Sequence, residues 1–257
     1  MDKVDNLTVV ILTKNEEKDI IDAINNAQKI TDKVLIVDSG STDNTVALAE
    51  ANGARVVYRA WDNDFAAQRN FALEHVTTEW VLYLDADERM NYELIEDIDN
   101  KLHKNKKAQY RIIRRNSAFG RDFKYGVLGP DSVVRLFPKN GVKWEGKVHE
   151  RPVSEFKEVT LNGYLKHYTY ASFDEYMEKM NKYASIGAMD RKLRGKKCFV
   201  IKDLVLRPAF AFFKMYILKL GILEGWLGFV LCLNYGNYTL NKYTKLKMLG
   251  DREKVWL

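Results

Sequence analysis

The chain has 257 residues and a net charge of +6, with 46% hydrophobic residues, 30% charged residues and four prolines. This length supports one large domain or two small ones, and the composition excludes disordered, collagen-like and low-complexity proteins. Two cysteines are too few for a disulfide framework, and the acidic first residues lack a signal-peptide pattern. These features predict a protein of the reducing cytoplasm.

The charge is divided unevenly along the chain. Residues 1–100 contain 9 Lys and Arg against 21 Asp and Glu, whereas residues 101–257 contain 32 against 14. An acidic region can hold a divalent cation, and a basic region attracts phosphate, nucleic acid or anionic lipid. We therefore expect the two parts of the chain to have different roles.

Strand-like apolar runs alternate with helical spacings over the first hundred residues. The apolar runs cover residues 7–13, 34–38, 55–58 and 80–84. The helical spacings cover residues 20–27, 46–49 and 65–73, and Asn52-Gly53 fits the end of the second helix. This alternation predicts βαβ units and a doubly wound α/β sheet.

The pattern changes after residue 101. Residues 108–114, 132–137 and 162–170 resemble strands, and Ser172 has the spacing of a helix N-cap. Residues 204–233 are apolar and aromatic but are interrupted by charges, so no stretch reaches the about 20 apolar residues of a spanning helix. A helical C-terminal region is expected.

Polar residues follow three of the predicted strands. They are Thr13-Lys14-Asn15-Glu16, Asp38-Ser39-Gly40 and Asp85-Ala86-Asp87. Ligands of doubly wound sheets bind at the carboxyl ends of the strands, so these three segments are expected to meet at one edge. Residues 68–70 (Gln68, Arg69, Asn70) precede the last of these strands, and they either reach the same ligand or form a solvated helix face.

Asp85 and Asp87 are two residues apart and would point to the same side of an extended chain. Two such carboxylates repel each other unless a cation lies between them. Magnesium-like ions bind few protein carboxylates and complete their shell with phosphate oxygens. The alternative is an ordinary strand-end turn, but the two other polar strand ends nearby favour the metal site.

The succession VVILTKNEE, VDSGSTDNT, AAQRN and LDADE resembles family 2 glycosyltransferases of the GT-A fold. The later VRLF, WEGKVHE and HYTYASFDEYMEKMNKYA resemble the branch of bacterial lipopolysaccharide-core glucosyltransferases. The resemblance implies a GT-A, Rossmann-like, doubly wound mixed sheet with a helical, amphipathic C-terminal extension. It also implies a metal-dependent, inverting transfer of a hexose, with glucose favoured, from a UDP-sugar to a lipid-linked glycan such as the lipopolysaccharide inner core. The implied cofactor is Mg²⁺ or Mn²⁺.

This resemblance also implies how the chain is divided into domains. Residues 1–170 would form the catalytic domain, with a nucleotide-sugar-binding half over 1–100 and an acceptor-binding half over 101–170. Residues 171–257 would form the helical region. Uridine would be held by Thr13, Asn15, Glu16 and Asp38, and the metal and diphosphate by Asp85 and Asp87. The same site is expected to include Ser39, Gly40, Gln68, Arg69, Asn70 and Ala86.

The base motif departs from the family pattern. Many relatives carry a Glu/Asp-Asp pair, and this chain has His149-Glu150 in the corresponding place. Glu150 is expected to be the general base because a carboxylate must reach the acceptor hydroxyl. Asp131 and Glu145 are its rivals, and a loop salt bridge is its structural alternative. No QxxRW motif is present, which argues against a processive polymerase.

Three further residues are expected to belong to the site. His149 is expected to bind the metal or the diphosphate, although a lone histidine is as often structural. Trp144 and Arg135 are expected to bind the acceptor. Trp144 would stack on a sugar face, and the alternative is a tryptophan of the core.

The basic, aromatic tail predicts attachment to a membrane surface. Arg207 and Lys214 share a helix face, while Phe210 and Phe213 contribute to an apolar surface. The alternative is an apolar helix pair that packs on the catalytic domain or in a dimer. We expect a peripheral protein on the cytoplasmic face of the inner membrane, and the oligomeric state is open.

Two other functions compete with glycosyl transfer. A nucleotidyltransferase acting on a sugar phosphate would carry a glycine-rich loop after the first strand, where this chain has Thr13-Lys14-Asn15-Glu16. A non-enzymatic basic module would bind membrane or nucleic acid, but strand-end carboxylates would repel phosphate without a metal. No nucleic-acid partner is expected.

Overall fold

The computed structural model describes residues 3–104, 107–146 and 150–252, and the chain folds as two compact units. The sheet unit comprises the described residues up to 115 and from 131 to 167, and the helical unit comprises 116–130 and those from 168 onward. Residues 116–130 lie inside the range expected for the catalytic domain but group with the C-terminal helices. The reason is apolar packing, because Phe123 and Leu128 share a core with Tyr176 and Leu231.

The first part of the sheet unit alternates strands and helices as predicted. The elements are β1 (Leu7–Thr13), α1 (Ile20–Ala27), β2 (Val34–Asp38), α2 (Thr45–Ala51), β3 (Arg55–Tyr58), α3 (Phe65–His75) and β4 (Trp80–Asp85). The strands pair in parallel in the order β3-β2-β1-β4. Gly53 has a φ of +79°, which suits the left-handed residue that follows α2.

Antiparallel strands complete the sheet. Its order continues from β4 through β8, β6 and β11 to β5, and β9 pairs with β10 in a separate hairpin. The elements are β5 (Glu88–Met90), α4 (Tyr92–His103), β6 (Gln109–Ala118), β7 (Arg121–Asp122), η1 (Gly126–Leu128), β8 (Asp131–Pro138), η2 (Lys139–Gly141), β9 (Lys143–Glu145), β10 (Arg151–Val153) and β11 (Glu158–Tyr170). The predicted mixed, doubly wound sheet followed by a helical region is confirmed.

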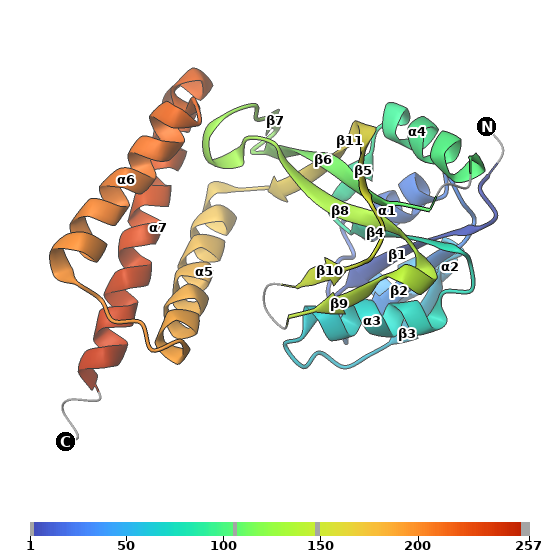
Figure 1. Cartoon of the computed structure of the whole chain (residues 1–257), viewed down its shortest axis with the longest axis horizontal. Coiled ribbons are helices and arrows are strands. Elements are labelled where there is room, and N and C mark those ends of the chain that lie inside the picture. Colours follow the sequence, from blue (N-terminus) through green and yellow to red (C-terminus); the bar gives the residue numbers. More distant parts are fainter. Residues whose placement is uncertain (1–2, 105–106, 147–149, 253–257) are drawn as a thin grey trace. The chain divides into compact units, whose positions relative to one another are not determined.

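Helices cover both faces of the sheet, and Figure 1 shows α3 and α4 on opposite sides of it. Successive residues of each buried strand face opposite layers. Val9 belongs to the core that includes Ile20 of α1 and Ile98 of α4, whereas Val10 belongs to the core that includes Ala72 of α3. Burial on both faces explains why the strands are continuous apolar runs.

The helical unit consists mainly of three helices, and α5 and α6 both contact α7 (Figure 1). Its elements after β11 are α5 (Phe173–Leu193), η3 (Val200–Leu206), α6 (Arg207–Phe213), η4 (Lys214–Leu218), η5 (Gly221–Glu224) and α7 (Gly225–Arg252). Ser172 caps α5 as expected, since its side chain accepts a hydrogen bond from the Glu175 amide at 3.1 Å. The segments η3 and η4 are π-helical turns.

Among the described residues, no single helix combines the length and the hydropathy needed to cross a bilayer. Val200–Leu218 and Gly221–Gly250 meet that test only when taken together, and they are bent by 72° at the break between them.

Candidate functional site

The carboxyl ends of β1, β2 and β4 lie side by side. Thr13 is in register with Asp38, and Leu12 is in register with Asp85. The Thr13 hydroxyl donates a hydrogen bond to Asp38 Oδ1 at 3.2 Å. The structure therefore brings together the three polar strand ends that the sequence singled out.

Asp38 shapes the loop that follows β2. One carboxylate oxygen accepts hydrogen bonds from the amides of Gly40 at 2.8 Å and Ser41 at 2.9 Å, and the other accepts from the Ser41 hydroxyl at 2.5 Å. Gly40 has a φ of +94°, a conformation that other residues rarely adopt. Because both oxygens are used within the loop, the uridine-binding role of Asp38 stays a prediction.

The loop after β1 is fastened to the same β2 loop. Asn15 has a φ of +58°, its amide donates to the Ser41 hydroxyl at 2.8 Å, and its side-chain oxygen accepts from the Thr42 amide at 2.8 Å. The Glu16 amide donates to the Thr45 hydroxyl at 2.7 Å. The two loops thus form one hydrogen-bonded wall beside the strand ends.

Residues 68–70 of α3 do not form a solvated helix face. Gln68 and Arg69 are buried, and the Gln68 amide donates to the Ser39 hydroxyl at 3.2 Å and to the Arg59 carbonyl at 2.9 Å. Among the described residues, Gln68 Oε1 and Arg69 Nε are buried without a hydrogen-bond partner. Such atoms are rare in native proteins, and they mark this helix face as part of the site.

A buried cluster of charges lies at the end of β4. The Asp85 carboxylate is bound by Arg135 and lies 3.5 Å from Arg69. The fully buried Glu88 accepts from the Asp85 amide at 3.1 Å, and it lies 3.2 Å from Arg114 and 3.7 Å from Arg135. Each carboxylate is therefore paired, as burial of charge requires.

The two carboxylates of this cluster differ in their pKa. Burial alone would raise the pKa of Asp85, but the positive charges of Arg135 and Arg69 outweigh it and hold that pKa well below its usual range. Burial and the nearby charge of Asp85 raise the pKa of Glu88, against the opposing effect of Arg135 and Arg114. Asp85 is therefore the member of the pair that ionises more readily.

Asp87 has a different environment from Asp85. It lies in the turn between β4 and β5, and its Oδ2 is 3.2 Å from Nε2 of His167 on β11. Sequence reasoning missed His167 and named His149, which lies outside the described residues. His167 was visible as the first residue of the HYTY run, within a segment correctly expected to be a strand, but its register against β5 was not.

The described residues contain no group of three or more His, Cys, Asp and Glu side chains that could hold a metal ion. Asp85 directs both carboxylate oxygens to arginines, whereas Asp87 contacts an imidazole. Asp87 would therefore be more available than Asp85 to bind a cation, because no arginine contacts it among the described residues.

Glu150, the expected base, lies next to Arg69. Its carboxylate is 22% exposed and is 3.6 Å from the Arg69 guanidinium. Its rival Asp131 is bound by two hydrogen bonds from Arg114, at 2.9 and 2.6 Å. Glu145 is exposed at the end of β9. Glu150 is thus a partly exposed carboxylate beside one arginine, with oxygen lone pairs that can accept from another donor.

The two residues expected to bind the acceptor are both buried. Trp144 is 5% exposed and packs edge-on against Tyr83 and Phe137, with the Arg69 guanidinium 4.7 Å from its ring centre. Arg135 lies within the charge cluster. Trp144 therefore lies in the core, which was the alternative to a sugar-stacking role. The acceptor-binding roles of Trp144 and Arg135 stay predictions.

Asn70 anchors the β9–β10 hairpin to α3. Its side chain donates to the Trp144 carbonyl at 2.8 Å and accepts from the Trp144 amide at 2.9 Å. A side chain that satisfies both backbone groups of one residue fixes the position of that residue. Asn70 thus fixes Trp144 and, with it, strand β9.

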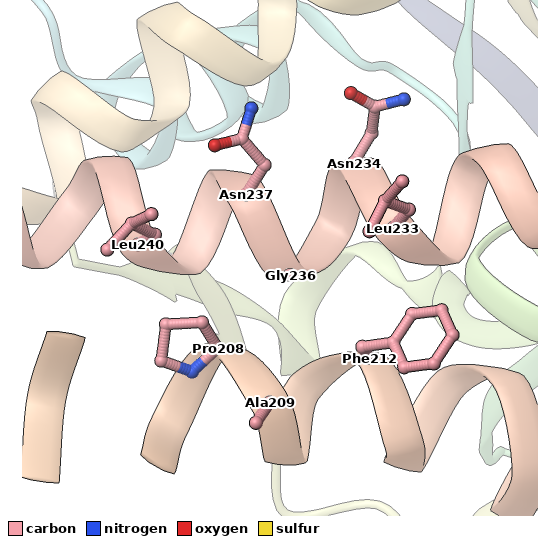
Figure 2. A pocket seen from close by; sticks show the side chains of 8 residues that line it. All are labelled: Pro208, Ala209, Phe212, Leu233, Asn234, Gly236, Asn237 and Leu240. Carbon is pink, nitrogen blue, oxygen red and sulfur yellow. The ribbon is translucent and has the colours of Figure 1, made fainter. Parts of the chain in front are cut away.

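A cavity of about 570 Å³ lies between α6 and α7 in the helical unit, and Figure 2 shows Asn234 and Asn237 on one side of it. The remaining lining is mostly apolar, with Phe212, Leu233 and Leu240 among its side chains. None of the described lining residues is titratable, so they provide no acid or base.

Comparisons with known proteins place the chain in a family. Residues 8–152 match the family model described as glycosyl transferase family 2. An uncharacterized glycosyltransferase of Rickettsia typhi is 30% identical over 96% of this chain and 89% of its own length. The lipopolysaccharide core biosynthesis glycosyltransferase LpsC of Rhizobium meliloti is 30% identical over 82% of this chain and 80% of its own length.

A solved structure of glucosyl-3-phosphoglycerate synthase from Mycobacterium tuberculosis is also similar, with 18% identity over 67% of this chain and 75% of that chain and a TM-score of 0.45. The family model spans more than half of the present chain, and the Rickettsia relative is matched over nearly its whole length. This protein therefore belongs to glycosyl transferase family 2.

Proposed function

We propose that this protein is an inverting, metal-dependent hexosyltransferase that uses a UDP-sugar, with glucose as the favoured sugar. The proposed acceptor is a lipid-linked glycan such as the lipopolysaccharide inner core. The observation that carries the proposal is the convergence of Thr13, Asp38 and Asp85 at adjacent strand ends in a family 2 chain. The similarity to LpsC, named for lipopolysaccharide core biosynthesis, supports the acceptor class.

The donor would lie along the wall formed by the two loops after β1 and β2. Thr13, Asn15, Glu16 and Asp38 are the residues proposed to hold uridine. The hydrogen bond from Thr13 to Asp38 and the bonds that join Asn15 to Ser41 and Thr42 preorganise this wall, which lowers the entropy cost of binding a ligand.

The donor set suits a divalent cation at Asp87. A carboxylate and an imidazole, here Asp87 and His167, are both ligands that Mn²⁺ accepts, and diphosphate oxygens would complete the shell. When bound, the cation would offset the negative charge that develops on the leaving diphosphate. Asp85, held by Arg69 and Arg135, would contribute through its fixed charge at the same edge.

Glu150 is the proposed general base. Its partly exposed carboxylate would accept the proton of the acceptor hydroxyl as the oxygen attacks the anomeric carbon. Arg69, 3.6 Å away, favours the ionised carboxylate and orients it. Inversion follows if the hydroxyl attacks from the face opposite the leaving diphosphate.

Binding of the donor can be tested by calorimetry. UDP is titrated into the wild type, Asp87→Ala and Asp22→Ala, with and without Mn²⁺; Asp22→Ala also removes one carboxylate, but from the exposed face of α1. We expect Mn²⁺-dependent binding that is lost only in Asp87→Ala. Equal binding by all three proteins would contradict the proposed role of Asp87. If instead a nucleoside triphosphate and a sugar phosphate yield pyrophosphate, the protein is a nucleotidyltransferase.

The base can be tested through turnover. Glu150→Gln is expected to lower UDP release from a UDP-sugar and acceptor by about 10²–10⁴-fold while UDP binding stays intact. Glu145→Gln, an exposed neighbour in the same hairpin, is the matched control and should keep its rate. If the effects are reversed, Glu145 is the base. The anomeric configuration of the product, measured by NMR, tests inversion.

We also propose peripheral attachment to the cytoplasmic face of the inner membrane, where a lipid-linked acceptor would be found. Phe210, Phe213 and Trp226 of the helical unit are exposed, with 60%, 46% and 77% of their surface accessible. Lys214 and Lys219 lie in the same segment and are also exposed. Exposed aromatic side chains combined with positive charge are typical of surfaces that bind anionic bilayers.

A further inference from the structure

Cationic side chains line a second cavity of the helical unit, of about 330 Å³. They come from different elements: Arg191 from α5, Lys202 from η3, Arg207 from α6 and Lys242 from α7. These positions are far apart in sequence, so the packing of the helices brings the charges together. We call this cluster, defined by these four side chains, the basic pocket.

A buried aromatic ring holds the basic pocket in place. Tyr243 is 4% exposed, and its ring centre lies 5.0 Å from the guanidinium of Arg191, 5.2 Å from that of Arg207 and 5.6 Å from the ammonium of Lys242. Cations that contact the same ring are restrained by cation–π attraction. The pocket is thus preorganised in the absence of any ligand.

The sequence of α5 leaves room for one of these cations. A Cβ atom at Gly187 would lie 3.0 Å from Cδ of Lys242, closer than ordinary packing allows. Glycine at this helical position therefore leaves room for the aliphatic stem of Lys242, whose ammonium nitrogen lies 4.7 Å from the centre of the Tyr238 ring. A glycine in a helix interior costs stability, so its packing role is informative.

The positive charge of the basic pocket is largely uncompensated. Asp203 pairs with Arg207 at 2.5 Å and accepts a hydrogen bond from the Phe199 amide at 2.8 Å. In the part of the chain that the structure describes, no carboxylate forms an ion pair with Lys202 or Lys242. Burial, followed by the charges of the two arginines in the pocket, lowers the pKa of Lys242. An anion in the cavity would relieve this repulsion.

The rim of the basic pocket is apolar. Leu206 and Phe210 line the same cavity, and 59% and 60% of their surface is exposed. The neighbouring Ile201 is exposed as well. A ligand that fits this lining has an anionic group for the cations and an apolar part for the rim, as an anionic lipid has.

We propose that the basic pocket binds the phosphate of an anionic lipid headgroup, with the acyl part of the lipid against Leu206 and Phe210. The inference deepens the proposed membrane attachment and rests on it, but it is independent of the proposed chemistry at Asp87 and Glu150. It predicts that attachment depends on particular cations and not only on the total positive charge.

Flotation of the full chain with vesicles tests this proposal. The vesicles contain phosphatidylcholine alone or with phosphatidylglycerol. The pocket variant Arg191→Gln/Lys242→Gln is compared with Lys124→Gln/Lys182→Gln, which removes the same charge from exposed positions of the helical unit. The Lys124 amide is bonded to Glu224, just before α7, which puts its backbone about 25 Å along that helix from Lys242.

The wild type and the control are expected to float with the anionic vesicles, and the pocket variant to partition about tenfold more weakly than the control. Equal partitioning of the two variants would show general charge attraction and refute the pocket. If the wild type binds inorganic phosphate by calorimetry but the variants float equally, the pocket takes a soluble phosphate and the lipid assignment is wrong.

Folding and donor binding are controlled separately. Lys202 lines the pocket but its side chain is exposed, so Lys202→Gln should not disturb folding. It is compared with Lys182→Gln, which removes the same charge from an exposed position outside the pocket. Both variants keep Tyr243, Arg191 and Arg207. Lys202→Gln is expected to reduce flotation, and equal flotation of the two would count against the pocket. UDP binding should be the same in all variants, so loss of flotation with intact UDP binding separates this inference from the proposed transferase activity.

Discussion

Replacement of Arg135 by methionine would test the buried charge cluster at the end of β4. Arg135 is 7% exposed, binds Asp85 and lies 3.7 Å from Glu88. Methionine keeps much of the aliphatic volume but removes the charge. Asp85 would keep Arg69 at 3.5 Å and Glu88 would keep Arg114 at 3.2 Å, so each carboxylate would lose one of its two arginine neighbours and keep the other.

The expected cost follows from burial. Removal of one partner of a fully buried ion pair destabilises a protein by about 3–5 kcal/mol. The loss here should be smaller, because the Asp85 side chain is 33% exposed and each carboxylate keeps one arginine, but it should exceed the loss of an exposed pair. The matched control is Arg111→Met. Arg111 forms hydrogen bonds of 2.6 and 2.9 Å with Glu158, but the two side chains are 32% and 41% exposed. Exposed pairs contribute about 0–1 kcal/mol.

The free energy of unfolding can be measured by urea titration, followed by the fluorescence of Trp80 and Trp144 in the sheet unit. In the wild type, Arg135 keeps the pKa of Asp85 below its unfolded value of about 3.9. The stability that Asp85 contributes is therefore present above pH 4 and is lost only in strong acid.

In Arg135→Met the pKa of Asp85 rises, and that of Glu88, already raised by burial, rises further. Protonation of either carboxylate then relieves the repulsion between the two. The stability difference between variant and wild type should thus shrink as the pH falls from 7 to 5. Equal losses for Arg135→Met and Arg111→Met at pH 7, or a loss independent of pH, would refute this account of the cluster.

Two further predictions concern stability and reactivity. Gly163→Ala should destabilise the protein by more than about 1 kcal/mol, because φ at Gly163 is +81° and the new Cβ would lie 2.3 Å from the Leu94 amide nitrogen. The control is Gly195→Ala, where φ is also positive but the space around the new Cβ is open, so this variant should lose less stability in the same thermal or urea melt. Burial raises the pKa of the Cys232 thiol to about 11, so at pH 8 it should be alkylated far more slowly than the half-buried Cys198; peptide mass spectrometry would detect the order, and faster labelling of Cys232 would contradict its burial.

Much of the sheet unit was predictable because its signals are local. Strands buried on both faces must be apolar at every position, and the helices between them must place apolar residues at helical spacing. The sequence therefore located β1 to β4 and their helices closely. It overlooked α4, although Leu94, Ile95, Ile98 and Leu102 have the same helical spacing.

The strand ends were predictable for a related reason. In a parallel sheet the carboxyl ends of neighbouring strands meet at one edge, so Thr13, Asp38 and Asp85 were expected to lie close together before their register was known. Only the structure revealed that both carboxylate oxygens of Asp38 accept hydrogen bonds from the loop that follows it.

The partners of the charged residues were decided by tertiary structure. Arg135 meets Asp85 from 50 residues away, and His167 meets Asp87 from 80 residues away. Each meeting depends on the order and register of antiparallel strands, and a shift of one residue would turn either side chain to the opposite face of the sheet. Local composition carries no information on that register.

The amino-acid sequence by itself thus determined the α/β class, the edge of the sheet where polar residues collect, the family and the basic character of the C-terminal part. Tertiary structure decided which arginines neutralise Asp85 and Glu88, that His167 accompanies Asp87, and that four distant cations line one cavity, three of them against Tyr243. The physical reason is range: propensity and periodicity act over a few residues, whereas ion pairs and pockets form between segments that only the folded packing brings together.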